Sequence, residues 1–301
     1  MSVARALALA AVVFWGASFV ATKQVLTEAT PLALICLRFA LGTALLLAWT
    51  SLSRRWRRLP TRDLVAAVLL GLQSVTLHQL IQVDGLVTAS AQHAGWLIGT
   101  SPVFAALLAW LFLGERLGPA RLVGVAAAFA GTVLVVAGGH GLGQVLALPS
   151  GRGDLLVLAS AVNWAAYSVL SRDLVRRQGA DLVTTLGMTV GWAALVPFFF
   201  STGQVASLGR LSGGAWVAVA FLGIACSGLG YLFWNRALTV LGAAELVTFL
   251  YLEPLVTVVT AWLLLGEPVR PLTVAGGLVI LAGVAMVQRP WQRRQARPVG
   301  A

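Results

Sequence analysis

The chain has 301 residues, of which 59% are apolar and only 10% are charged, and its mean hydropathy is +0.89. Soluble domains are typically about 45–50% apolar and about 25% charged, so this chain has too few charges to cover a water-exposed surface. The composition excludes a soluble enzyme, a nucleic-acid-binding module and a secreted disulfide scaffold. It predicts a polytopic membrane protein that contacts the lipid bilayer and has no nucleic-acid partner, although the formal net charge is +11.

Apolar segments bounded by Arg, Pro and Gly predict ten membrane-spanning helices. About 20 residues in a helix cross a bilayer, and a lipid-exposed backbone must satisfy its own hydrogen bonds. In chain order the segments are 5–25, 31–52, 63–83, 88–113, 120–137, 154–171, 182–200, 214–236, 243–265 and 271–288. The expected fold class is therefore an all-α integral membrane protein with ten transmembrane helices.

The longest connection, at 139–153, is rich in glycine and separates a first half, 1–138, from a second half, 154–288. A basic tail at 289–301 follows. The glycines do not complete the G-x-G-x-x-G spacing of a dinucleotide loop, and no strand precedes them. Cys36 and Cys226 both fall inside apolar segments, which favours small buried side chains over a disulfide or a metal pair. We therefore expect neither a cofactor nor a metal.

Successive connections between the predicted helices lie on alternate sides of the membrane, and the basic residues are concentrated in the connections of one side. One side holds 16 of the 21 Lys and Arg residues, while the other holds only Lys23, Arg152, Arg210 and Arg270; Arg38 lies within a segment. Cytoplasmic loops are enriched in these residues. The asymmetry predicts that both termini are cytoplasmic, and an even number of spans permits this.

The second half repeats part of the first at an offset of 152 residues. The matches include Pro102 with Pro254, 109–111 with 261–263, and 113–115 with 265–267. Proline, tryptophan and glutamate are uncommon here, so their agreement at one offset indicates duplication rather than chance similarity. Each half holds five spans, an odd number, so the second copy must be inserted upside down. Inverted repeats are typical of secondary transporters, whose substrate site lies near the membrane midplane.

Four segments resemble the drug/metabolite transporter superfamily, specifically its EamA-type exporters. They are T-S-P-V-F-A-A-L-L-A-W-L-F-L-G-E at 100–115, L-E-P-L-V-T-V-V-T-A-W-L-L-L-G-E at 252–267, F-W-G-A-S-F at 14–19 and Y-L-F-W-N-R-A-L at 231–238. The resemblance extends over essentially the whole chain. It implies two inverted five-helix EamA-like halves and export of small metabolites across the bacterial inner membrane. Many members handle amino acids; others handle drugs, vitamins or nucleotide-linked compounds.

The tryptophan, histidine and glutamine residues described below favour the amino-acid exporter branch. The expected partner is therefore a small-molecule substrate. Amino acids, including aromatic or other apolar ones, are the expected class, and broad efflux of drugs or other metabolites is the alternative. Transport by alternating access through a cavity between the halves is the expected mechanism. Because no Walker sequence is present, the energy is expected to come from gradients rather than from ATP, by uniport or by proton antiport.

Glu253 lies about ten residues into the ninth segment, directly before Pro254. A charge near the membrane midplane costs about 2.5–3.5 kcal/mol by insertion scales, so this residue indicates a polar cavity. The proline removes a backbone donor and disturbs the helix one turn earlier. Two hypotheses follow: Glu253 binds a substrate ammonium group or couples a proton, or it is a structural carboxylate that caps a broken helix. Ser101 occupies the equivalent depth in the fourth segment.

Trp15 and Trp164 lie midway along the first helix of each half. Tryptophan usually occupies the membrane interface, so two at mid-depth suggest walls of a substrate pathway, with helix packing as the alternative. Ser18, Asn163 and Tyr167 lie within a turn of them and provide hydrogen-bonding groups suited to an amino acid.

The third and fourth segments contribute a set of polar residues toward the non-cytoplasmic half. The candidates for a polar mouth or vestibule are His78, Gln82, His93 and Trp96. Arg38 is expected either to pair with Asp84 or to extend toward the interface. Tyr231 lies near the cytoplasmic end of the eighth segment and is expected to be an interface residue.

A membrane-embedded enzyme is the alternative from another class. The chain has neither H-E-x-x-H nor G-x-S-x-G and no paired aspartates, so no catalytic constellation is expected. Glu115 and Glu267, in the repeated Leu-Gly-Glu, lie at helix ends and are expected to be structural. The G-x-x-x-G pairs at 95–99 and 187–191 permit close helix contact, which we assign to packing within a monomer rather than to a dimer.

Overall fold

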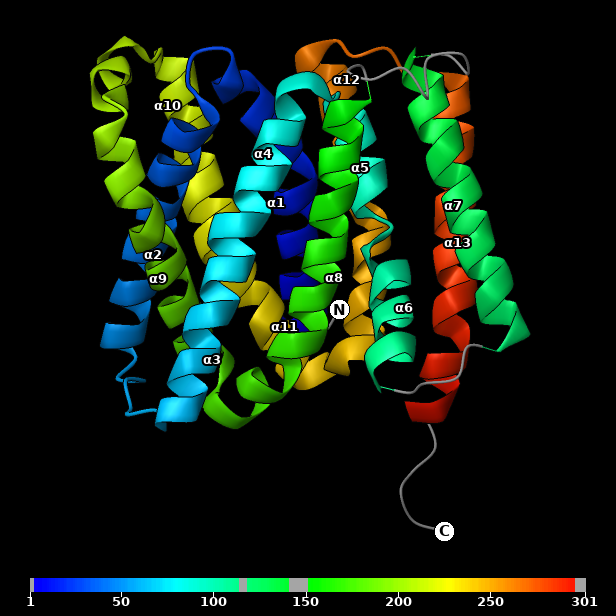
Figure 1. The fold of residues 1–301 in the computed structure, drawn as a ribbon, viewed down its shortest axis with the longest axis horizontal. Helices are drawn as coiled ribbons and strands as arrows, with labels where there is room; N and C mark the ends of the chain where they lie inside the picture. The colour runs from blue at the N-terminus through cyan, green and yellow to red at the C-terminus, as the bar shows by residue number, and fades with distance from the viewer. Residues whose placement is uncertain (1–2, 114–117, 141–150, 296–301) are drawn as a thin grey trace.

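The structure, a computed structural model, describes residues 3–113, 118–140 and 151–295, and the elements in these ranges are helical. In chain order they are α1 (Val3–Leu26), α2 (Pro31–Leu52), α3 (Thr61–Gly71), the π-helix η1 (Leu72–Leu77), α4 (His78–Thr88), α5 (Ala91–Ile98), α6 (Ser101–Leu113), α7 (Pro119–His140), α8 (Arg152–Gln178), α9 (Ala180–Ser201), the 3-10 helix η3 (Gln204–Arg210), α10 (Gly213–Ala220), the π-helix η4 (Phe221–Gly230), α11 (Tyr231–Leu246), the 3-10 helix η5 (Val247–Leu252), α12 (Glu253–Leu265) and α13 (Pro271–Gln295). Figure 1 shows these helices side by side, most of them running between an upper and a lower end of the molecule.

The prediction of an all-α membrane protein is confirmed. In the described ranges, six helical stretches are long and apolar enough to cross a membrane: Val3–Leu26, Pro31–Leu52, Thr61–Thr88, Arg152–Gln178, Ala180–Ser201 and Gly213–Ala237. Shorter apolar helices lie at Leu122–Val135, Phe249–Leu265 and Pro271–Val287. Within the described residues, each predicted apolar segment is helical, and most bounds differ from the predicted ones by a few residues.

Two of the predicted segments are interrupted at the positions that the repeat relates. The predicted helix 88–113 is two helices, because α5 ends at Ile98 and α6 begins at Ser101, one residue before Pro102. In the second half, η5 ends at Leu252 and α12 begins at Glu253, one residue before Pro254. Proline fits the first turn of a helix but not its interior. Each proline therefore starts a new helix in the middle of the bundle.

Glycines bring the helix backbones close together. A Cβ atom at Gly71 of α3 would lie 2.3 Å from the carbonyl oxygen of Gly187 in α9, and one at Gly124 of α7 would lie 2.6 Å from that of Gly283 in α13. Such contacts leave no space for a larger side chain. The G-x-x-x-G pair at 187–191 thus packs within the chain. Helices α7 and α13 form a closely packed pair at the right of Figure 1.

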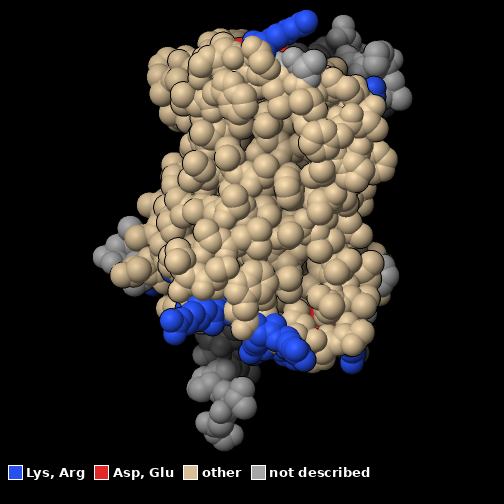
Figure 2. Space-filling model, turned by 90° about the vertical axis from the view of Figure 1, so that its left-hand side faces the viewer, with Lys and Arg blue, Asp and Glu red and all other residues tan. Residues whose placement is uncertain are grey.

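Charged residues lie mainly at the two ends of the bundle. On the face that Figure 2 shows, a broad belt without visible Lys or Arg separates several basic residues at the lower edge from fewer at the upper edge. At the lower end, the Arg177 guanidinium lies 3.0 Å from the Asp63 carboxylate. At the upper end, the Glu28 carboxylate accepts hydrogen bonds from the backbone and the side chain of Ser212, at 2.6 and 2.7 Å. These bonds hold the pKa of Glu28 below its ordinary value, because they favour the ionised form.

Candidate functional site

A central cavity lies between the helices of the two halves and encloses about 590 Å³ of space between atoms, part of which is open to solvent. Its walls come from α1, α2, α4, α5, α6, α8, α11, η5 and α12. Seven of the residues predicted from the sequence line this cavity: Trp15, Ser18, His78, Gln82, Ser101, Trp164 and Glu253. The structure therefore brings together side chains that are up to 238 positions apart in the chain.

Three aromatic rings form one wall of the cavity. The ring centroids of Trp15 and Trp164 are 6.1 Å apart, and Tyr231 lies 5.6 Å from Trp15 and 6.0 Å from Trp164. Trp15 is fixed in place because its indole Nε1 donates a 3.0 Å hydrogen bond to the backbone oxygen of Cys226. Aromatic surface of this kind contacts apolar groups through its area and cations through the ring face.

The interface position expected for Tyr231 was wrong. Its side chain is buried, with 7% exposed, and it faces the two tryptophans. The predicted segment ended at 236, whereas α11 continues to Leu246. Tyr231 therefore lies well inside the bundle instead of one turn from the membrane surface.

Glu253 is the acidic residue of the cavity. It is the first residue of α12, it is 9% exposed, and its carboxyl group forms no hydrogen bond or ion pair with any residue that the structure describes. Its backbone oxygen accepts a 2.9 Å hydrogen bond from the Thr257 hydroxyl. The local helix start thus uses the backbone of Glu253 and leaves its carboxyl group available to the cavity.

Arg38 is the basic residue of the cavity, and both expectations for it were wrong. Its side chain is 5% exposed; Nε donates to the Ser227 hydroxyl at 2.8 Å, and Nη1 donates to Gln79 Oε1 at 3.4 Å. Asp84 instead pairs with Arg152 at 3.0 Å. The guanidinium points inward because η4 and α4 pack against α2 and present oxygen acceptors to it.

The polar side chains around these charges differ in how well they are satisfied. The hydroxyls of Ser18 and Ser101 donate to the backbone oxygens of Trp15 and Ile98, one turn earlier, at 2.7 and 2.6 Å. His78 is 4% exposed, and its ring centroid lies 5.4 Å from that of Trp164, but its Nδ1 atom is buried without a hydrogen-bond partner in the part of the chain that the structure describes. Buried polar atoms without partners are uncommon and often mark functional positions.

Four of the residues predicted from the sequence lie outside the central cavity. Asn163 donates from Nδ2 to the backbone oxygen of Gln73 at 3.1 Å and so joins α8 to η1. Tyr167 packs 5.3 Å from Trp164 and lines a smaller, separate pocket. Trp96 is 1% exposed, and its ring packs against Gly277 of α13. The fourth residue, His93, belongs to a polar network at the upper end.

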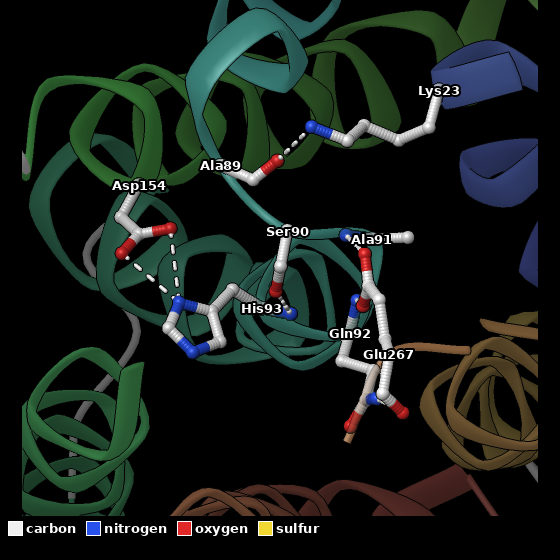
Figure 3. A network of polar contacts seen from close by, with 8 residues as sticks. All are labelled: Lys23, Ala89, Ser90, Ala91, Gln92, His93, Asp154 and Glu267. Carbon is white, nitrogen blue, oxygen red and sulfur yellow. Dashed lines mark hydrogen bonds and ion pairs between the residues drawn. The ribbon is translucent and has the colours of Figure 1, made fainter. Parts of the chain in front are cut away.

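Figure 3 shows this upper network, which joins the start of α5 to the loop after α12, to α1 and to the start of α8. The Glu267 carboxylate accepts hydrogen bonds from the backbone nitrogens of Ala91 and Gln92, at 3.0 and 3.2 Å. Acidic groups stabilise a helix N-terminus, so Glu267 has the structural role expected for it. The other repeated glutamate, Glu115, lies outside the described residues.

Two further contacts complete the upper network. His93 Nδ1 lies 3.1 Å from the Asp154 carboxylate at the start of α8. The Lys23 ammonium donates to the backbone oxygens of Leu86 and Ala89 at the end of α4, at 3.0 and 2.9 Å. In Figure 3 these groups lie at the junction of several helices. These contacts join the helices at the upper end of the bundle, and their residues do not line the central cavity.

Among the residues that the structure describes, no group of three or more His, Cys, Asp or Glu side chains is placed to hold a metal ion. Cys36 and Cys226 are both buried and free. The residues that line the central cavity provide charged groups, hydrogen-bonding groups and aromatic rings.

Membrane helices that surround a cavity with an acidic and a basic side chain are the construction of a small-molecule transporter. The EamA-like transporter family matches the chain twice, at residues 3–137 and at residues 151–289. The protein therefore belongs to the EamA-like transporter family.

The chain is similar over most of its length to several proteins named as transporters. An uncharacterized transporter of Archaeoglobus fulgidus is 31% identical over 90% of this chain and 92% of its own. A probable terminal-alkyne amino-acid exporter of Streptantibioticus cattleyicolor is 34% identical over 81% of this chain and 80% of its own. A riboflavin transporter of Rhizobium johnstonii is 28% identical over 81% of this chain and 73% of its own. One crystal structure has the same fold, with a TM-score of 0.68 at 23% identity over 95% of this chain and 98% of that one.

Proposed function

We propose that the protein exports amino acids, including aromatic or other apolar ones, across the inner membrane of a bacterium. The observation that carries this proposal is the central cavity itself. Its aromatic wall suits an apolar side chain, and the Glu253 carboxyl group, which has no partner among the described residues, suits an ammonium group. The similarity to a probable amino-acid exporter supports the same substrate class.

Alternating access is the proposed mechanism, with ten spans arranged as two inverted five-helix halves. The halves are 1–138 and 154–288, joined by 139–153 and followed by the basic tail at 289–301. Two observations support this division. The family matches the chain twice, and the irregularities recur at related places: π-helical turns in η1 and η4, and helix starts at Ser101 and Glu253.

Helix contacts support the same symmetry. Helix α1 packs against α11 and α12, while α8 packs against α4 and α6. The first helix of each half thus contacts the third and fourth segments of the other half. A pseudo-two-fold axis in the membrane plane produces reciprocal contacts of this kind. Rocking of one half against the other would expose the cavity to each side in turn, with the protein acting as a monomer.

Transport by purified protein in proteoliposomes tests the function. We expect radiolabelled phenylalanine or leucine to enter protein-containing vesicles faster than protein-free vesicles, with a rate that saturates as the concentration rises. Riboflavin is the comparison substrate, because a similar protein is named as its transporter. Transport of riboflavin without transport of any amino acid would reject the amino-acid assignment and favour export of another metabolite. Turnover of the substrate into a product would instead indicate an enzyme.

The proposed orientation places both termini in the cytoplasm. The basic residues that favour it are concentrated around 54–62 and in the tail at 289–301, because cytoplasmic segments are enriched in Lys and Arg. We expect His140→Cys, in a background without Cys36 and Cys226, to react with an impermeant maleimide in intact cells. Trp56→Cys should react only after permeabilisation. Labelling of the two positions in the opposite order would show that the orientation is reversed.

A further inference from the structure

We propose that Arg38 is the carboxylate-binding residue of the central cavity, so that the cargo carries an anionic carboxylate group. This inference rests on the proposed transport of small molecules through the cavity and adds a recognition site to it. Glu253 and Arg38 then bind the two charged ends of one zwitterionic molecule.

The Arg38 guanidinium is buried, and its hydrogen-bond partners in the described part of the chain are neutral groups. Its Nε atom donates to the Ser227 hydroxyl and its Nη1 atom to the Gln79 amide oxygen. Phe39 lies beneath it, with the guanidinium carbon 5.4 Å from the ring centroid. Across the described ranges, no carboxylate forms an ion pair with Arg38; Asp63, Asp84, Asp154 and Asp181 pair with other basic residues.

A guanidinium in this position is costly unless an anion meets it. A charge inside the membrane is tolerated where it faces a cavity and binds a partner or the transported solute. Arginine presents a planar fork that matches the geometry of a carboxylate. Ser227 and Gln79 fix the orientation of the fork by holding Nε and Nη1, and Arg38 lines the cavity. The group is therefore positioned to receive an anion from the cavity.

His78 provides a second, independent indication of a ligand. Its Nδ1 atom is buried, has no hydrogen-bond partner among the described residues and belongs to a side chain that lines the same cavity as Arg38. His78 and Gln79 are adjacent residues at the start of α4, directly after the π-helical turn η1. Such turns are frequent at functional sites. In a neutral imidazole one ring nitrogen donates and the other accepts, so the ammonium group of a bound zwitterion, as a donor, would satisfy the Nδ1 atom.

The charges of the cavity favour a neutral zwitterion over a simple ion. When Glu253 is ionised to bind an ammonium group, its charge and that of Arg38 cancel, and a bound zwitterion leaves that balance unchanged. A substrate with only one charged group would pair with Arg38 or with Glu253 and leave the other group unmatched. Leaving one partner of a buried charge pair unmatched is strongly unfavourable. An α-amino acid carries both charges at one end and leaves its side chain for the aromatic wall.

Three probes separate the two charges in a binding experiment. The probes are phenylalanine, its amide, which lacks the carboxylate, and 3-phenylpropionate, which lacks the ammonium group. Isothermal titration of the purified full-length protein in detergent measures each affinity. We expect the wild-type protein to bind phenylalanine most tightly. Arg38→Gln should weaken phenylalanine binding at least about thirtyfold and should change binding of the amide by less than about threefold.

Gln79→Glu tests the same contact without removing the arginine. The new carboxylate would occupy the position of an oxygen that already accepts from Arg38, so the guanidinium would be paired internally. We expect this variant to remain monodisperse and to lose affinity for phenylalanine but not for the amide. It provides the test if Arg38→Gln does not fold.

Two results would reject the inference and are distinct from each other. The first result is that the wild-type protein binds phenylalanine and its amide with equal affinity, or that Arg38→Gln weakens the binding of both equally. It would show that Arg38 does not bind the carboxylate, and the proposed amino-acid transport would be unaffected. Failure of the wild-type protein to bind all three probes would reject the proposed amino-acid function and the carboxylate site with it.

Discussion

Trp15→Ala and Trp164→Ala should each reduce the affinity for an aromatic amino acid about thirtyfold and lower its transport accordingly. The two rings pack against each other and against Tyr231 at the wall of the cavity. Removing a large aromatic side chain that contacts a ligand in a buried pocket costs about 2 kcal/mol or more, which corresponds to about a thirtyfold change in affinity. Proteoliposome transport at a range of phenylalanine concentrations measures the effect as a rise in the half-saturating concentration.

The chain offers matched controls for the loss of a tryptophan. Trp216 of α10 and Trp262 of α12 are 42% and 57% exposed, so Trp216→Ala and Trp262→Ala should transport as the wild type does. Trp15→Phe retains a ring but removes the hydrogen bond from Nε1 to the backbone of Cys226, and it should lose less than Trp15→Ala. If both alanine variants transport normally, the tryptophans serve helix packing and the pathway lies elsewhere.

The helices were predictable because the membrane imposes a strong and simple rule. Every backbone polar group within the bilayer must be paired, so long apolar segments are helical whatever their neighbours are. The disturbance before Pro254 was predictable for a similarly local reason, since a proline cannot occupy a helix interior without loss. The structure meets that expectation with the 3-10 helix η5. The full break at Gly99 and Thr100 was not expected, although Pro102 occupies the related position.

The direction in which a side chain points was much less predictable. In a soluble helix, polar residues mark the solvent side, but a membrane helix is apolar on most faces, and this contrast is lost. Arg38 shows the consequence. Its partner Ser227 lies 189 positions away, and the sequence around Arg38 gives no reason to choose Ser227 over Asp84 as that partner. Trp96 was expected at a polar mouth, yet it packs on Gly277, and a glycine gives no sign of the ring that will lie against it.

The sequence also does not distinguish a polar residue that lines the cavity from one that joins helices. His78 and His93 are both histidines in neighbouring predicted segments. One leaves its Nδ1 atom unpartnered at the central cavity, and the other pairs with Asp154 at the upper end. Both histidines face α8, His78 beside Trp164 and His93 beside Asp154. The difference therefore depends on which level of α8 each histidine meets, and the sequence provides no measure of that position. Tertiary packing therefore decides which polar residues belong to the candidate site.

Glu253→Gln should reduce amino-acid transport at least about thirtyfold if the carboxyl group binds the substrate ammonium or couples a proton. Glutamine preserves the size of the side chain and its position at the start of α12, but it carries no charge and does not titrate. Loss of one partner from a buried pair of charges costs about 2–5 kcal/mol, which corresponds to about thirtyfold or more in affinity. Glu253→Asp keeps the charge on a shorter side chain and should retain part of the activity.

The pH dependence of transport separates binding and coupling from a purely structural role. If Glu253 exchanges a proton during the cycle, the wild-type rate should change with pH, and Glu253→Gln should remove that change together with most of the rate. Glu28→Gln is the matched control, because Glu28 lies in the loop between α1 and α2, does not line the cavity, and accepts hydrogen bonds from Ser212 through its carboxylate. It should transport normally at every pH. A Glu253→Gln variant with an unchanged rate and an unchanged pH profile would show that this carboxyl group serves only the start of α12, whose Thr257 hydroxyl already bonds to the backbone there.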